Sequence, residues 1–284
     1  MKPILKWVGG KTQIIDKVLS KFPVSITGNY NEPFLGGGSV LLAVLSAIKT
    51  NKIQISGNIL ASDINETLIA LYNFIKCDPQ VFYDTILPYI QTYNSKTPDE
   101  QDIYYYACRS EFNTLQDKTC LQAAVLFLFL NKTCFRGLWR EGPNGFNVPF
   151  GHYKSPEIVS LSSLQELHTL IQSVIFTCQN YSQSLSNVGP DDFIYLDPPY
   201  VPEKKTSFTR YSKCDFSEQE HINLFSLLNS CPAKFVMSNS ESQLVQSAFN
   251  DATRFNIETF SCKRSINSKR PNAVTNEVFV SKIN

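Results

Sequence analysis

The stretch DFIYLDPPY, residues 192–200, constrains the fold of this chain more than any other segment. Its apolar run FIYL is uninterrupted, which is typical of a central strand covered on both faces of a parallel sheet. The run ends on Asp197, and the two prolines that follow cannot donate a backbone hydrogen bond. We therefore predict an open α/β sheet with Asp197 at its carboxyl edge, where ligands bind in such folds.

The DPPY residues favour an amino group as their ligand. Asp197 and the carbonyl of Pro198 only accept hydrogen bonds, so together they match a group with two hydrogens to donate. Pro199, like Pro198, stops the strand ladder and leaves carbonyls unpaired, and Tyr200 offers a flat ring on which a planar base can stack. The alternative is a polar strand end, a proline turn and a core tyrosine, but this four-residue combination is expected by chance in roughly one in a thousand chains.

A glycine turn with a downstream acid suggests a nucleotide-like cofactor. The segment NYNEPFLGGGSVLLAVLSAI, residues 29–48, predicts a short strand, a turn at Gly36 to Gly38 and a helix. Such a turn, within EPFLGGGSV at residues 32–40, lets a ligand approach the backbone. A second strand ends on Asp63, 25 residues after Gly38, and an acid there can accept ribose hydroxyls. Asp63 as a helix cap is the alternative, because SDINE resembles a capping sequence.

The βα pattern stops after residue 66 and resumes near residue 156. Residues 67–130 have helical periodicity, with Asp78-Pro79 as a helix start, and GPNG at residues 142–145 predicts a hairpin. Strands are expected again at SVIFTC, DFIYLD, AKFVMSN and in the tail NAVTNEVFVSKI. We therefore predict one domain made of residues 1–66 and 156–284, interrupted by an inserted domain of residues 67–155.

Basic and aromatic residues gather in the loop-rich part of that insertion. Arginine can pair with guanine edges or phosphates, and an apolar side chain can fill a gap in a base stack. A solvated loop with its aromatic rings packed on the helices is the other interpretation. The candidates for nucleic-acid contact are Lys132, Phe135, Arg136, Leu138 and Arg140, with a second basic set at Lys263, Arg264, Lys269 and Arg270 that suits phosphates.

Composition narrows the class of protein. The net charge is +1, so a nucleic-acid surface must be a local patch. Eight scattered cysteines without a C-x-x-C pair, and only three histidines, argue against a zinc site and predict reduced core cysteines in an intracellular, cytoplasmic protein with no metal. The apolar run at residues 123–130 is shorter than the ~20 residues a bilayer requires, which predicts a buried helix and no membrane partner.

Taken in order, these motifs resemble the Dam-like N6-adenine DNA methyltransferases over nearly the whole chain. The resemblance rests on KWVGGK at residues 6–11, EPFLGGGSV, SDIN and DPPY, with FNVPFGHYKSP at 146–156 and SFTRY at 207–211 also typical. It implies a class I methyltransferase core, Rossmann-like with a mixed sheet, and an inserted recognition domain of helices and a hairpin. It also implies S-adenosylmethionine as the cofactor, double-stranded DNA as the substrate and no metal.

The resemblance further implies roles for single residues. Trp7 and Lys11 would hold the methionine end of the cofactor, Phe34 and Gly36 would line its site, Asp63 would hold the ribose, and Asn180 with Tyr181 would lie by its adenine. Asp197, also in contact with the cofactor site, would hold the target adenine with Pro198 and Tyr200. Accepting both amino hydrogens favours a pyramidal nitrogen with a directed lone pair, and the base must leave the duplex to reach the site.

One departure from the family pattern leaves the target sequence open. Members that methylate GATC usually carry Asn-Gly-Leu in the recognition loop, whereas this chain has Arg136 in place of the asparagine. GATC and a related AT-centred palindrome such as CATG are both compatible with that loop. Among other functions, an N4-cytosine methyltransferase more often has serine at the Asp197 position, and a non-catalytic DNA-binding module would not need DPPY, Lys11 and Asp63 together.

Overall fold

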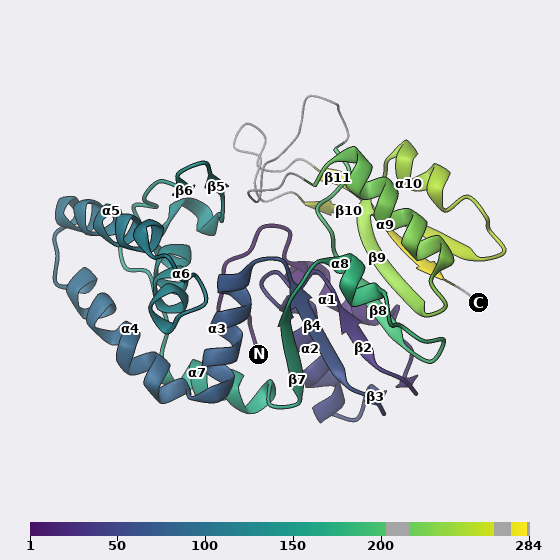
Figure 1. The fold of residues 1–284 in the computed structure, drawn as a ribbon, viewed down its shortest axis with the longest axis horizontal. Coiled ribbons are helices and arrows are strands. Elements are labelled where there is room, and N and C mark those ends of the chain that lie inside the picture. The colour runs from purple at the N-terminus through teal and green to yellow at the C-terminus, as the bar shows by residue number, and fades with distance from the viewer. Residues whose placement is uncertain (203–215, 264–273, 283–284) are drawn as a thin grey trace.

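The computed structural model describes residues 1–202, 216–263 and 274–282 and contains a seven-stranded sheet at its centre (Figure 1). The strand order is β10-β11-β9-β8-β2-β4-β7, and β11 runs antiparallel to both of its neighbours while the other pairs are parallel. The predicted mixed sheet is confirmed, and its order is consistent with a Rossmann-like methyltransferase fold. The strands are β2 Tyr30–Glu32, β4 Ile59–Asp63, β7 Val174–Cys178, β8 Phe193–Leu196, β9 Lys234–Ser240, β10 Phe255–Lys263 and β11 Val274–Lys282.

Strand β8 is the central strand that its sequence predicted. It lies between β2 and β9, and all four of its residues are buried. Phe193 and Tyr195 join one core cluster, and Ile194 and Leu196 join a second cluster. Because successive side chains of a strand point to opposite faces, this division shows that both faces of the sheet are covered.

Two groups of helices provide that cover. The first packs into the cluster that contains Tyr195, and the second packs into the cluster that contains Ile194. The first group comprises α1 Ile15–Leu19, α2 Ser39–Lys49, α3 Glu66–Cys77 and α7 Leu161–Leu170; the second comprises α8 Tyr181–Leu185, α9 Glu218–Ser230 and α10 Gln243–Ala248. Short elements complete this part of the chain: the 3-10 helix η1 Lys11–Ile14 and the strand pair β1 Ser25–Ile26 and β3 Gln54–Ile55.

A further helical region lies to one side of the sheet, at the left of Figure 1. Its helices α4 Pro79–Asn94 and α5 Pro98–Thr114 both pack on α6 Leu121–Thr133, in which residues 123–130 are all buried, as the apolar run predicted. Asp78 caps α4 by accepting from two backbone N–H groups, which confirms the predicted helix start. The core of this region is continuous with the core under the sheet, and the division at residues 66 and 156 stays a prediction.

A hairpin follows α6 through the 3-10 helix η2 Phe135–Gly137. Its strands β5 Glu141–Gly142 and β6 Gly145–Phe146 pair antiparallel, so the hairpin predicted from GPNG is confirmed. Within the part of the chain that the structure describes, no helix is long and apolar enough to cross a membrane.

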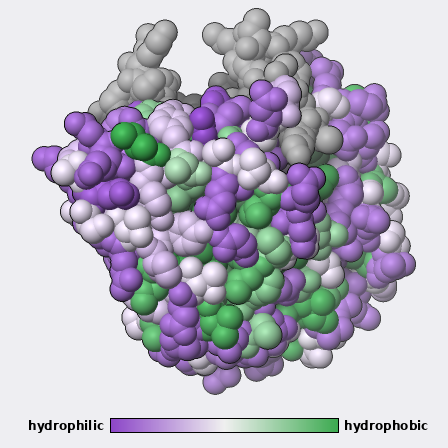
Figure 2. Space-filling model, turned by 60° about the vertical axis from the view of Figure 1, so that its left-hand side comes forward, coloured by the Kyte–Doolittle hydropathy of each residue, from purple (hydrophilic) through white to green (hydrophobic). Residues whose placement is uncertain are grey.

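The side of the molecule that carries α4 and α5 comes forward in Figure 2, where apolar side chains are interspersed with hydrophilic ones. Val81 on α4 and Ile103 on α5 are single exposed apolar residues, 49% and 72% accessible. Isolated exposed residues of this kind are ordinary on a solvated surface and do not by themselves indicate a binding site.

The prediction that the cysteines are core residues is confirmed only in part. Cys108, Cys134 and Cys231 are free and buried, Cys120 is free and half-buried, and Cys77 and Cys178 are free and exposed. The two exposed cysteines occupy the last positions of α3 and β7, where the chain leaves the core. The side chains of the two remaining predicted core cysteines, Cys214 and Cys262, lie outside the described residues.

Candidate functional site

Three acidic residues stand along one edge of the sheet. Glu32 ends β2, Asp63 ends β4, and Asp197 directly follows β8. These strands are neighbours and parallel, so their carboxyl ends meet at the same edge. The sequence predicted Asp63 and Asp197 at strand ends, and the sheet order brings them together with Glu32.

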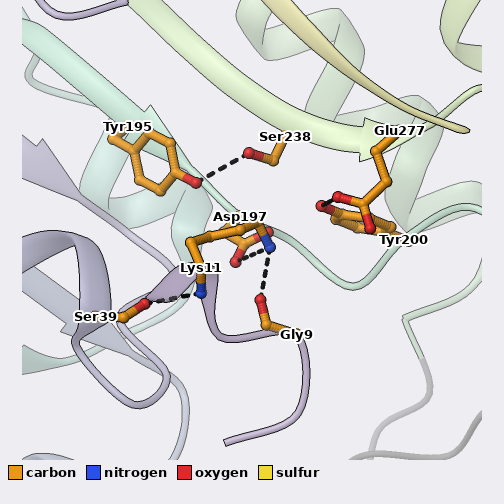
Figure 3. A network of polar contacts seen from close by, with 8 residues as sticks. All are labelled: Gly9, Lys11, Ser39, Tyr195, Asp197, Tyr200, Ser238 and Glu277. Atoms are coloured by element: carbon orange, nitrogen blue, oxygen red, sulfur yellow. Dashed lines mark hydrogen bonds and ion pairs between the residues drawn. The ribbon is translucent and has the colours of Figure 1, made fainter. Parts of the chain in front are cut away.

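An ion pair joins the N-terminal segment to Asp197 (Figure 3). The Nζ of Lys11 lies 2.6 Å from Asp197 Oδ2 and also donates to the Gly9 carbonyl at 2.7 Å. The Lys11 backbone N–H donates to Ser39 Oγ at the start of α2 (3.1 Å), so the segment 6–11 is fixed against the glycine turn. Burial raises the pKa of Asp197, while the Lys11 ammonium opposes that rise. Lys11, which the resemblance placed at the methionine end of the cofactor, is thus paired with Asp197.

Tyr200 lies beside this ion pair and is held from two sides. Its hydroxyl donates to Glu277 Oε2 on β11 at 2.9 Å, and Lys11 Nζ lies 5.0 Å from the centre of its ring. Pro198 is buried, and Pro199 is half-buried like Tyr200. The arrangement places a carboxylate, an ammonium group and an aromatic ring at the carboxyl end of the central strand.

The glycine turn lies directly under Trp7. Gly36 has a φ of +48°, and a Cβ added there would lie 2.6 Å from the indole nitrogen of Trp7. The Gly36 backbone N–H donates to Asp63 Oδ2 at 2.9 Å, and Asp63 Oδ1 accepts from the N–H of Asn65 at 3.0 Å. Only glycine fits this close approach, and Asp63 ties the turn to the end of β4.

Three aromatic side chains pack together at the start of α8. Phe34 and Tyr181 are nearly parallel, with ring centroids 5.5 Å apart, and Phe216 packs on both rings. The Tyr181 hydroxyl donates to Glu220 Oε2 at 2.7 Å. Asn180 caps α8 by accepting from the Ser182 N–H at 2.9 Å, a structural role that its sequence position alone did not reveal.

Glu32 is a buried acid that sequence reasoning did not single out. Its side chain is 2% exposed and accepts from the Tyr30 hydroxyl at 2.6 Å. Burial raises the pKa of Glu32 to about 8; the bond from Tyr30 opposes that rise and nearby Asp197 adds to it. The only local signal was an acid a few residues before the glycine turn in EPFLGGGSV.

The shifted pKa of Glu32 makes folding stability depend on pH. Between pH 4.5, the ordinary pKa of a glutamate, and about pH 8, the unfolded chain releases the Glu32 proton while the native protein retains it. The stability that protonated Glu32 contributes is therefore fully present below pH 4.5 and is lost as the pH rises towards 8. Glu32→Gln removes the titration. From pH 5 to pH 8, we expect the wild type to lose on the order of 3 kcal/mol of unfolding free energy relative to Glu32→Gln.

Urea unfolding at pH 5, 6.5 and 8 measures this difference. The exposed Glu166 on α7 offers a matched control, and Glu166→Gln should follow the wild type at every pH. A constant difference between the wild type and Glu32→Gln across that range would contradict a native Glu32 that holds its proton.

The hairpin region carries the predicted nucleic-acid residues at its surface. Phe135 is 43% exposed and lies under the guanidinium of Arg136, whose Cζ is 5.2 Å from the ring centre. Arg136 has a φ of +56°, a left-handed conformation that asparagine adopts more readily than arginine. Leu138 is half-buried, and Arg140 is exposed with its Nε donating to Asn147 Oδ1 across the hairpin at 2.7 Å.

Asn131, at the end of α6, anchors this region to the N-terminal segment. Its Oδ1 accepts from the Lys6 N–H at 2.9 Å, and its Nδ2 donates to the Lys6 carbonyl at 2.8 Å and to the Gly137 carbonyl at 3.3 Å. Lys132 is half-buried, and its carbonyl accepts from Lys6 Nζ at 3.2 Å. The segment that leads into Trp7 and Lys11 therefore also contacts the base of the hairpin.

Part of the predicted site lies outside the described residues. This applies to SFTRY at 207–211 and to Arg264, Lys269 and Arg270, whose phosphate contacts stay predictions. In the described parts of the chain, no group of three or more histidine, cysteine, aspartate or glutamate side chains could hold a metal ion.

Comparison with known proteins gives a consistent result. The family described as D12 class N6 adenine-specific DNA methyltransferase matches residues 7–266. The type II methyltransferase M.MjaIII of Methanocaldococcus jannaschii is 36% identical over 279 residues, which cover 95% of this chain and 94% of the relative. The DNA adenine methylase of Haemophilus influenzae is 32% identical over 88% of this chain and 84% of its own, and that of Escherichia coli K12 is 31% identical over 94% and 90%.

Proposed function

The chain belongs to the D12 class of N6 adenine-specific DNA methyltransferases, and from this membership we propose how it acts. We propose that it methylates the adenine of a short AT-centred palindrome, GATC or a CATG-like site, in double-stranded DNA. The base would be flipped out of the duplex, and its amino nitrogen would take the methyl group directly from S-adenosylmethionine: the N–C bond forms as the C–S bond breaks, S-adenosylhomocysteine leaves, and one amino proton is lost to solvent. The observation that carries the proposal is the juxtaposition of Asp197 and Tyr200 beside Lys11 at the end of β8.

Asp197 and Pro198 supply the chemistry at the target base. Adenine's amino nitrogen is a poor nucleophile because its lone pair is delocalised into the ring. The carboxylate of Asp197 and the Pro198 carbonyl each accept a hydrogen bond from the amino group. These two bonds favour a pyramidal nitrogen, whose lone pair is no longer delocalised into the ring. Tyr200 offers a face on which the flipped base stacks, and alignment with electrostatic stabilisation accounts for the rate enhancement.

The residues along the sheet edge fit S-adenosylmethionine, which supplies an electrophilic methyl group when it is bound. The Asp63 carboxylate at the end of β4 suits ribose hydroxyls, because each carboxylate oxygen can accept more than the one backbone N–H it receives here. Phe34, half-buried and stacked on the buried Tyr181, offers an aromatic ring for a purine. Trp7, packed on the turn at Gly36, and Lys11 border the place for the methionine end.

Mapping of the methylated base tests the proposed function. Incubation of the purified protein with S-adenosylmethionine and random-sequence duplex DNA, followed by mapping of N6-methyladenine, should return one short palindrome with the modified base in its AT centre. Methylation of cytosine only, or of RNA in preference to duplex DNA, would refute it.

Asp63→Ala should weaken binding of S-adenosylmethionine, because a ribose hydroxyl then loses a charged acceptor. We expect a loss of about 1–3 kcal/mol in binding free energy by calorimetry, with DNA affinity in the absence of the cofactor unchanged. Asp63 also holds the N–H of Gly36, so Asp63→Asn, which keeps one acceptor oxygen, serves as the comparison. Unchanged cofactor affinity in Asp63→Ala would remove Asp63 from the cofactor site.

A further inference from the structure

We propose that Glu277 is a positioning residue for the target base: its carboxylate holds Tyr200 so that the ring face receives the flipped adenine beside Asp197. The inference rests on the proposed function, and it assigns a role to a residue of the last described strand. Glu277 acts through Tyr200 and is not itself placed on the reacting atoms.

The contact spans the sheet from its central strand to β11. Tyr200 follows β8, whereas Glu277 lies on β11, and β9 separates the two strands in the sheet. The Tyr200 hydroxyl nevertheless reaches Glu277 Oε2 at 2.9 Å, as Figure 3 shows. Glu277 is paired with Ser240, the last residue of β9, so its carboxylate is presented at the edge where β8 also ends.

The backbone next to Tyr200 is fixed independently of that contact. The Val201 N–H donates to Asn239 Oδ1 at 3.1 Å, and its carbonyl accepts from Ser240 Oγ at 2.7 Å. With the backbone tied to β9, the side-chain torsions of Tyr200 remain to be set, and an aromatic χ2 torsion is intrinsically broad. The bond to Glu277 fixes the hydroxyl end of the ring and therefore the direction of its face.

The charges around the ring favour this geometry. Lys11 Nζ lies 5.0 Å from the ring centre and is paired with Asp197, while the Glu277 carboxylate accepts a hydrogen bond from the hydroxyl at the other end of the side chain. A hydrogen bond from a phenol to a carboxylate is stronger than one between neutral groups. The ring is thus held at its tip by an anion and faced by a cation, and Glu277→Ala removes the restraint at the tip.

A double-mutant cycle tests the proposal. If Glu277 acts through the Tyr200 hydroxyl, then Glu277→Ala and Tyr200→Phe should each lower kcat about 10-fold, with the KM for S-adenosylmethionine within 2-fold of the wild type, an estimate from the same contact. The double variant should be no slower than either single variant, because both remove the same bond. Glu277→Gln, which keeps an acceptor oxygen but loses the charge, should recover part of the activity.

A second measurement follows the base itself. With 2-aminopurine in place of the target adenine, the fluorescence reports how the flipped base is stacked, and Glu277→Ala and Tyr200→Phe should change it equally. Asn276→Ala on the same strand is the matched control, since its side chain bonds Glu241 instead (2.9 Å), and it should leave kcat and fluorescence unchanged.

Several results would overturn the proposal while leaving the proposed function intact. These are wild-type kcat in Glu277→Ala, additive losses in the double variant, or a Glu277→Gln variant as slow as Glu277→Ala, which would assign the effect to charge. Failure of the wild type to methylate adenine in any duplex would instead refute the proposed function, so the two failures are distinguishable.

Discussion

Replacing Asp197 by alanine should lower kcat about 100- to 1,000-fold, in the range found when one preorganised polar contact to a transition state is removed. Asp197 is proposed to accept a hydrogen of the adenine amino group as that nitrogen becomes nucleophilic. An interaction that strengthens in the transition state affects kcat more than KM. Single-turnover methylation of a duplex that carries the mapped site, with excess enzyme, measures this loss directly.

The ion pair with Lys11 requires a separate control for stability. Lys11 is 4% exposed, and loss of Asp197 leaves its ammonium with the Gly9 carbonyl as a remaining partner. Removing one member of a buried pair can cost about 3–5 kcal/mol, so thermal unfolding and DNA binding must accompany the kinetics. Asp197→Asn keeps an acceptor oxygen without the charge and should fall between the two proteins. Near-normal turnover in folded Asp197→Ala would exclude the catalytic role.

The central elements could be predicted because their signals are local. The unbroken run FIYL predicts a strand covered on both faces, and β8 is such a strand. Asp78-Pro79 predicts a helix start, because the acid caps the first backbone N–H groups and proline has no N–H of its own, and α4 begins there. GPNG predicts a hairpin because its glycines tolerate unusual dihedral angles, and Gly145 has a φ of +87°.

Other elements lacked such signals. Strand β10 was not predicted, because its polar and apolar residues resemble a surface segment until β11 is known to pair with it over nine residues. Cys77 and Cys178 were predicted to be buried because cysteine is usually a core residue. They are exposed because α3 and β7 end at these positions, which the residue type does not reveal. Tertiary pairing decides both cases.

The candidate site, too, could be predicted only in part. Asp63 and Asp197 could be placed at one edge of the sheet because parallel strands align their carboxyl ends. The partners of Asp197 and Tyr200 could not be predicted. Lys11 is 186 residues from Asp197 in sequence, and Glu277 is 77 residues from Tyr200. The contact of Glu277 depends on the insertion of β11 beside β9, and nothing in the local sequence NEV specifies that register.

The second large effect concerns recognition of the target sequence at Arg140. Its Nε donates to Asn147 across the hairpin, which leaves the guanidinium with further N–H donors suited to the O6 and N7 acceptors of guanine. Neighbouring Trp139 is 6% exposed and packs against Phe127 and Phe146, with ring centroids 4.0 and 4.2 Å away. The base of the Arg140 side chain therefore stands on a rigid part of the hairpin.

We expect Arg140→Ala to relax the preference at one base pair by roughly 5- to 150-fold, the equivalent of the 1–3 kcal/mol that a bidentate contact contributes. Methylation rates on duplexes with every single substitution in the four-base site measure it. Arg140→Lys is the decisive comparison: it keeps the charge but not the two-pronged geometry, so it should relax the preference as alanine does. Lys269→Ala, at a position outside the described residues, should weaken all sequences alike and reduce the salt dependence. If Arg140→Lys restores both rate and preference, or Arg140→Ala slows every duplex equally, Arg140 binds only the phosphate backbone.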